Sequence, residues 1–190
     1  MFTTLFFFTT AYLMSTIEEW FIHKYLMHNK AILSLYNNHI THHAKTNPDY
    51  SINDSNLSYI CVDVSSLNDI IQIFFVLSIN SGILYILFNP YISLLTISCT
   101  VSALLGINIL LWNTYHSYIH KLDGSKICNF PKGLSKNFID KYLNESNIYV
   151  KWIVNNHKQH HNNYRTNFNI VFPGGDYLFG TYKETMIKDE

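Results

Sequence analysis

Long uncharged stretches alternate with polar ones along this chain. The longest uncharged run covers residues 70–120, which is far too long for a single core helix of a soluble protein. An Asn89-Pro90 turn signal divides it, leaving a segment of about 20 residues on each side, the length that crosses a membrane. The pattern predicts a helical hairpin with spans at about 70–88 and 91–112.

The N-terminal segment 1–17 is also uncharged, and Glu18, Glu19 and His23 follow it directly. A cleaved signal peptide would carry a basic start and a small-residue cleavage site, and neither pattern is present. We therefore expect a retained first helix, with a span at about 2–22.

These patterns predict an all-α integral membrane bundle of about three spans, with four as the upper count. A single domain, 1–190, is expected, with a helical cap at 113–190. All thirteen Lys and Arg residues lie within 24–45 or from Lys121 onward. The positive-inside rule then places the cap in the cytosol. It also places the Asn-x-Ser sequons at Asn53, Asn56 and Asn144 on the unglycosylated side.

Composition narrows the class of protein further. Charged residues make up 14% of the chain and the formal net charge is zero, against about 25% charged residues in soluble proteins. No basic stripe indicates a nucleic-acid partner. Cys61, Cys99 and Cys128 lie far apart without C-x-x-C spacing. We interpret them as small apolar residues or free thiols and assign them no role.

The histidines form repeated patterns that account for all ten in the chain. An H-x-x-H-H cluster occurs twice, and two spaced pairs complete the set. Offsets of three and four residues bring imidazoles to one face of a helix, so the patterns predict a shared metal centre. Structural zinc sites use about four ligands, whereas ten suit two metals with about five each. The predicted ligands are His23, His28, His39, His42, His43, His116, His120, His157, His160 and His161.

His23 and His28 stand five residues apart, about 140° around an ideal helix. Either they bind different metals or the helix loosens between them. Glu19 lies one turn before His23 and is a candidate to accept its second ring N–H, or it is a plain interfacial carboxylate. Glu19, Asp123 and Asp176 are the acids we consider for offsetting the charge of the metals.

Ligand type alone does not choose the metal, because imidazole suits iron, copper, nickel and zinc. The chain has no nucleotide-binding or haem-attachment motif, so a redox-active site would need electrons from another protein. A metal-binding or transport protein is the alternative class. That class predicts ionisable groups inside the spans, and the uncharged hairpin offers little of this kind.

Four histidine boxes and the chain's ending resemble a known family. EEWFIHKYLMH resembles the first H-x4-H box, NHITHH the second, HSYIH the third and NHKQHH the fourth, while DYLFGTY resembles a D-x-x-F-G-T-Y terminus. In their order these motifs resemble the integral-membrane fatty acid hydroxylase and sterol desaturase superfamily. The fatty acid (sphingolipid) 2-hydroxylases are the nearest branch in motif order.

The resemblance implies a di-iron centre held by all ten histidines, with no catalytic residue separate from it. Zinc would be possible in a purified or crystallised form. Such a monooxygenase uses O2 to hydroxylate an acyl chain of a fatty acid or sphingolipid, with electrons from cytochrome b5 and its reductase. In eukaryotes it works in the endoplasmic reticulum. A desaturase, or a sterol or carotenoid oxidase with the same centre, is the alternative within this class.

Overall fold

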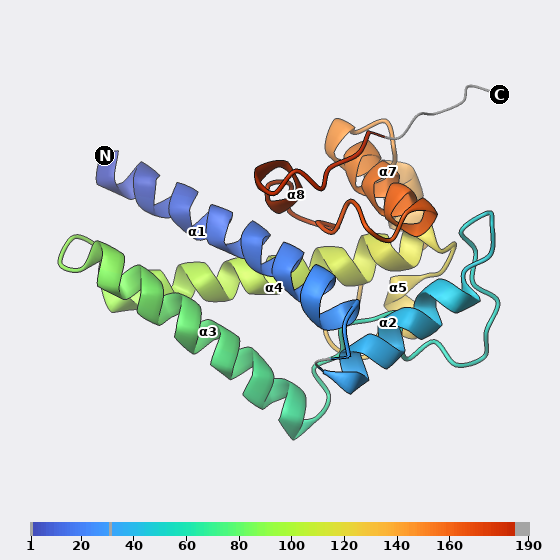
Figure 1. The fold of residues 1–190 in the computed structure, drawn as a ribbon, viewed down its shortest axis with the longest axis horizontal. Coiled ribbons are helices and arrows are strands. Elements are labelled where there is room, and N and C mark those ends of the chain that lie inside the picture. The colour runs from blue at the N-terminus through green and yellow to red at the C-terminus, as the bar shows by residue number, and fades with distance from the viewer. Residues whose placement is uncertain (1, 31, 185–190) are drawn as a thin grey trace.

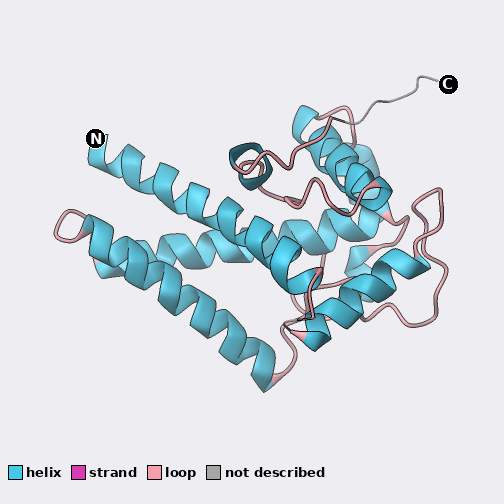
Figure 2. Ribbon diagram, viewed as in Figure 1, coloured by secondary structure: helices cyan, strands magenta, loops and turns pink. Residues whose placement is uncertain are grey.

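The computed structural model describes residues 2–30 and 32–184, and over these residues the protein is helical. An isolated antiparallel bridge between Thr46 and Ile52 is the sole β-type pairing within that part of the chain. The predicted all-α class is confirmed (Figure 2). The elements are α1 (Phe2–Phe21), the π-helix η1 (Ile22–Met27), α2 (Leu33–Lys45), α3 (Leu67–Phe88), α4 (Leu94–Ile119), α5 (Gly124–Ile127), α6 (Lys136–Tyr142), α7 (Ile148–Asn162) and α8 (Gly175–Leu178).

Helices α3 and α4 begin where local capping signals place them. Ser66 and Asp69 form a reciprocal capping box at the start of α3, and the Ser93 side chain caps the start of α4. The predicted turn at Asn89-Pro90 joins the two helices. The N-terminus of α1 and this turn lie at one end of the molecule, and the shorter cap helices lie at the other (Figure 1).

Two of the predicted spans agree with membrane-length helices. Among the described residues, Asp69–Phe88 and Leu94–Ile119 are long and apolar enough to cross a membrane, and most of their side chains are not buried within the protein. The span predicted at 2–22 does form a 20-residue helix, α1, which is long enough but is not apolar enough to be counted with the other two. Its two glutamates, Glu18 and Glu19, lower its hydropathy.

The predicted boundary between the second hairpin span and the cap, at residue 112, is not a break in the structure. Helix α4 runs on to Ile119, so one continuous rod carries both the apolar segment and the third histidine motif. This continuity fixes His116 relative to the hairpin more rigidly than a loop would.

Separate apolar clusters hold the two ends of the molecule. Away from the cap, Phe7 and Ala11 of α1 pack on α3 and α4 through Leu84, Phe88, Ile97 and Val101. In the cap, α7 packs on the end of α4 through Val150, Ile153 and Val154 against Tyr115 and Ile119, with Ile139 of α6 beside them. The second cluster brings the histidines of α7 close to those of α4.

The interpretation of the cysteines was wrong for two of the three. Cys61 and Cys128 form a disulfide that joins the segment before α3 to the segment after α5. Cys99 is free and exposed on α4. Because 67 residues separate the paired cysteines, their spacing gave no signal, and only the folding of both segments against α4 brings them together.

Candidate metal centre

The ten histidines come from four elements that meet at the cap end of the molecule. η1 supplies His23 and leads directly into His28, and α2 carries the first H-x-x-H-H cluster. The end of α4 carries His116, followed by His120, and α7 carries the second cluster. Figure 1 shows α2, α4 and α7 gathered at this end. The structure thus brings together all ten predicted ligands.

The side chains divide into two groups, defined by which Nε2 atoms lie together. The first histidine group contains four residues whose ring nitrogens lie within 4.8 Å of one another, and His43 joins it through contacts with His39 and His160. The second contains four residues on the same criterion, and His116 joins it through His42. The first group is His23, His28, His39, His43 and His160; the second is His42, His116, His120, His157 and His161.

The π-helix explains how His23 and His28 reach the same group. A π-helix, bonded from i to i+5, holds more residues per turn than an α-helix, so positions five apart lie closer to one face than the 140° expected of an ideal α-helix. The two rings stack with centroids 5.3 Å apart. Of the two alternatives for this pair, the loosened helix is the one that the structure shows.

The spacing of the Nε2 atoms fits metal ligands. Neighbouring Nε2 atoms lie 2.9 to 3.2 Å apart in both groups. Imidazole nitrogens bind transition metals at about 2.1 Å, and two such ligands at a right angle would be about 3.0 Å apart. The observed contacts therefore match adjacent ligands around a common ion.

Hydrogen bonding among the rings cannot account for this packing. His39 Nε2 lies 3.0 to 3.1 Å from the Nε2 atoms of His23, His28 and His43, yet a ring nitrogen carries at most one proton. The Nε2 atoms of His28 and His43 also contact His160 Nε2. Several lone pairs must therefore face one another, and a bound cation would turn that repulsion into coordination.

Backbone carbonyls orient four of the rings by accepting a hydrogen bond from Nδ1. His23 donates to Phe168 at 2.6 Å, His116 to Ile60 at 2.7 Å, His120 to Tyr50 at 2.7 Å and His160 to Thr166 at 2.8 Å. A proton on Nδ1 leaves the lone pair on Nε2, the atom that points into the group. This is how metal-binding histidines are usually oriented.

Burial keeps these imidazoles uncharged. Burial away from solvent lowers the pKa of His28, His43 and His120 to about 4 in each case. For His43, the positive charge that neighbouring histidines would carry is a second cause of the lowered pKa. The more deeply buried His157 and His160 have pKa values well below the ordinary one for the same reasons. At neutral pH the groups therefore present lone pairs rather than protons.

Glu19 fills neither of the two roles considered for it, as partner of the His23 ring or as a plain interfacial carboxylate. Its carboxylate is buried and accepts backbone N–H bonds from Ile170 and Val171 at 2.7 Å each, and from Phe172 at 2.9 Å. The His23 ring donates to the Phe168 carbonyl instead. Glu19 thus fixes the segment 168–172, and its effect on the metal centre passes through the backbone.

Asp176 acts on the same segment from its other side. It accepts hydrogen bonds from the backbone N–H groups of Phe168 and Asn169 and from the Thr181 hydroxyl. Its carboxylate contacts no histidine in the described residues. Gly175 beside it lies against α1, where a Cβ would collide with Trp20 and with the Thr16 carbonyl, so the ending packs on α1 only with glycine there.

Asp123 lies away from the histidines. It caps the short helix α5 by accepting bonds from the Ser125 N–H and hydroxyl. Of the three acids considered from the sequence, two therefore brace the backbone that carries a ligand-orienting carbonyl, and the third serves a local cap.

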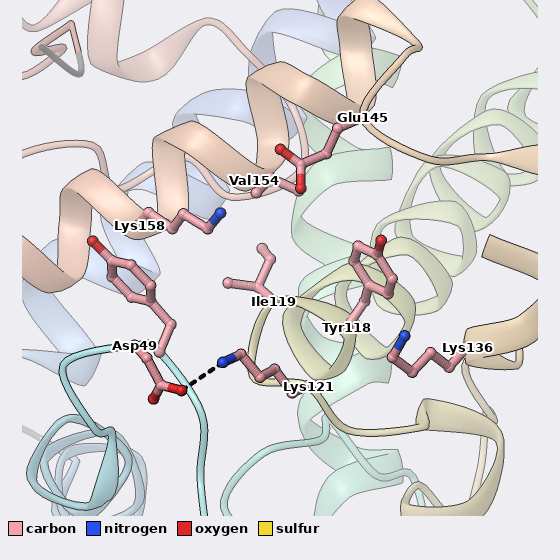
Figure 3. A pocket seen from close by; sticks show the side chains of 9 residues that line it. Asp49, Tyr118, Ile119, Lys121, Lys136, Glu145, Val154 and Lys158 are labelled. Carbon is pink, nitrogen blue, oxygen red and sulfur yellow. Dashed lines mark hydrogen bonds and ion pairs between the residues drawn. The ribbon is translucent and has the colours of Figure 1, made fainter. Parts of the chain in front are cut away.

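Two cavities flank the centre. One of about 600 Å³ opens on the first group, with His28 and His43 in its lining. The other, of about 200 Å³, lies behind the second group and is lined by charged and tyrosine side chains around Ile119 (Figure 3). Its Lys121 pairs with Asp49, and Lys136 pairs with Asp140, so most of its charge is neutralised locally.

No family model, curated protein or solved structure matches this chain. The four histidine boxes and the ending therefore carry the family resemblance by themselves, and the geometry of the ten histidines is the evidence that bears on function.

Proposed function

We propose that this protein is a membrane-bound di-iron monooxygenase that uses O2 to hydroxylate an acyl chain of a fatty acid or sphingolipid. One observation carries the proposal: ten neutral imidazoles converge as two groups of five beside an apolar helical hairpin. Soluble di-iron bundles use carboxylate ligands instead, whereas an all-histidine pair of sites matches the family that the four boxes resemble.

The residues present fit two metal ions. The histidines of each group would hold one ion through Nε2, and the carbonyls of Phe168, Ile60, Tyr50 and Thr166 would keep four of the rings in place. When bound, two iron ions would supply the activation of O2 and the insertion of one oxygen atom into an unactivated C–H bond. The electrons would come from an external carrier such as cytochrome b5 with its reductase.

Membrane placement follows from exposed apolar surface. We propose α1 as a third span beside α3 and α4, because it packs against both through Phe7 and Ala11. Its outer side chains are exposed, with Phe2 at 84%, Leu5 at 66% and Phe6 at 58%. In lipid these side chains would be solvated, whereas in water they would form a large apolar patch. We propose that the histidine end lies in the cytosol, at the endoplasmic reticulum membrane in a eukaryote, because the basic residues are concentrated at that end.

Lipid mass spectrometry would test this proposal. The chain is expressed in a eukaryotic host with cytochrome b5, beside a His160→Ala variant and an Asn38→Ala control on the exposed side of α2. We expect a new acyl or ceramide species heavier by one oxygen atom in the wild type and the control, and none in His160→Ala. A species lighter by two hydrogens would instead show a desaturase. Unchanged lipids, with iron bound and cytochrome b5 present, would contradict lipid oxidation.

A further inference from the structure

We propose that the 600 Å³ cavity beside the first histidine group binds an acyl lipid with an acidic headgroup, a carboxylate or a phosphate. The assignment of the acyl chain rests on the proposed function. The acidic headgroup is inferred from the cavity's own residues, which are histidines, apolar or aromatic side chains, and cations.

Two histidines of the first group line the cavity. His28 and His43 are half-buried, whereas His23, His39 and His160 are buried and do not line it. A ligand in the cavity would therefore contact this group. A chain lying in it would bring its C–H bonds next to the ion that the group would hold.

Much of the lining is apolar or aromatic. Tyr36 and Ile40 of α2 line the cavity together with Tyr164 and Phe168 of the segment after α7, and the Tyr164 ring stacks on His28 with centroids 6.1 Å apart. A volume of about 600 Å³ lies in the range of cavities that bind small organic ligands. Side chains of this kind suit a hydrocarbon chain.

The lining also includes two cations and no carboxylate. Lys24 and Arg165 line the cavity, and neither forms an ion pair with any of the described residues. The Lys24 ammonium lies 4.4 Å from the Trp20 ring centre, and the Arg165 guanidinium lies 5.8 Å from that of Tyr164. Aromatic contacts hold both groups in place without neutralising them, so they are free to bind an anion.

The second cavity lacks this combination, which is why the assignment goes to the first. It is a third of the volume, and two of its lysines are paired with aspartates. Only the larger cavity combines apolar or aromatic side chains, unpaired cations and histidines of the candidate metal centre.

Photocrosslinking would test the site without relying on turnover. The protein is reconstituted in nanodiscs of neutral phosphatidylcholine and irradiated with a long-chain fatty acid that carries a diazirine. We expect crosslinks on peptides containing Tyr36, Ile40 or Tyr164. An unlabelled fatty acid or lysophosphatidic acid should compete, the better competitor identifying the headgroup, while the fatty acid methyl ester should compete about tenfold less well.

Matched variants complete the test. Lys24→Gln combined with Arg165→Gln should weaken binding of the acidic probe about tenfold and leave the ester unaffected. Lys132→Gln, an exposed lysine elsewhere on the cap, should change neither. Ile40→Trp should block both ligands by filling the cavity. Metal content measured on each variant shows whether the centre has folded.

Equal competition by acid and ester on the wild type, or crosslinks outside the cavity, would overturn the inference even if the double variant did not fold. The proposed function fails separately. If the protein binds acidic lipid at this cavity but oxidises none, the proposed function is wrong and the proposed binding site stands. If it oxidises acidic and neutral lipids equally, with no effect of substituting Lys24 or Arg165, the proposed binding site is wrong and the proposed function stands.

Discussion

His42 and His43 are adjacent in the chain but belong to different histidine groups. The Nε2 atom of His42 lies 2.9 Å from that of His161, and the Nε2 atom of His43 lies 3.1 Å from that of His160. The adjacent pair on α2 therefore faces the adjacent pair on α7, and each pair contributes one ligand to each group. Two successive helical positions differ by about 100° around the axis, which aims their side chains at two neighbouring points.

This arrangement predicts that the two ions can be weakened one at a time. His42→Ala should weaken binding in the second group and His43→Ala in the first, so that each variant keeps about one of two metals after dialysis against a chelator. The reason is that each substitution removes one of five ligands from one group only. Metal analysis of the purified proteins, with Asn38→Ala as the α2 control, provides the measurement. A single substitution that released both metals would show that the groups are not separable.

The candidate ligands could be picked out in the sequence, but most of the contacts that orient them could not. Histidine is rare and its spacing repeats, so all ten candidate positions were visible as a pattern. The carbonyls that orient His23 and His160 belong to loop backbone, which has no side-chain signature. Glu19 and Asp176 were noticed as acids near the boxes. Both accept from backbone amides of segment 168–172, which is close to Asp176 in the sequence but 151 residues from Glu19 at Ile170, and only the tertiary fold shows this second contact.

The two long hairpin helices could also be predicted from a pattern in the sequence. Uncharged segments of span length predicted α3 and α4 closely, because lipid requires both apolarity and length. The Cys61–Cys128 pairing and the length of α4 depended instead on how the cap packs on the hairpin. The loosened turn at η1 was foreseen only as one of two alternatives, since an ideal helix could not bring His23 and His28 to one ion.

The stability of the metal-free protein should decrease as the pH falls below about 6.5, the ordinary pKa of histidine. Burial lowers the pKa of His28, His43 and His120 to about 4 in the folded state. Between these values the unfolded chain binds more protons than the folded one, so acid favours unfolding. The full contribution is present above about pH 6.5 and decreases toward about pH 4.

Thermal unfolding of the metal-free protein across this pH range would measure the effect. The metal-loaded protein is the comparison, because bound metal must be displaced before the ligands take up protons. Its midpoint should stay constant to a lower pH and then decrease with metal release. A midpoint of the metal-free protein that did not change between about pH 7 and pH 5 would contradict the assignment of neutral, buried imidazoles.

Glu19→Ala should destabilise the cap by at least about 2 kcal/mol, because it leaves three buried backbone N–H groups of segment 168–172 without an acceptor. Glu19→Gln should cost less, since its amide oxygen still accepts. Glu18→Ala is the matched control, with a single described side-chain bond to Asn80. Thermal unfolding checks the order Glu19→Ala, Glu19→Gln, Glu18→Ala. Equal effects of Glu19→Ala and Glu18→Ala would contradict the bracing role.

The Cys61–Cys128 disulfide and the distribution of basic residues favour opposite sides of the membrane for the histidine end of the protein. Disulfides persist in oxidising compartments, whereas the lysine and arginine distribution favours our proposal that the same face lies in the cytosol. We expect the charge distribution to decide, because it acts while the helices insert. Both thiols should then be reduced in living cells and form the disulfide after lysis without reductant, and the sequons at Asn53, Asn56 and Asn144 should carry no glycan.

Alkylation of intact cells before lysis, followed by a non-reducing gel, reports the thiols, with Cys99 as the free cysteine that labels after denaturation in either case. Endoglycosidase treatment reports the sequons independently. A pair that is already oxidised in cells, together with a glycosidase-sensitive shift, would place the histidine end in the lumen. Electrons for the metal centre would then have to come from a luminal donor, and a cytosolic cytochrome b5 could not reach it.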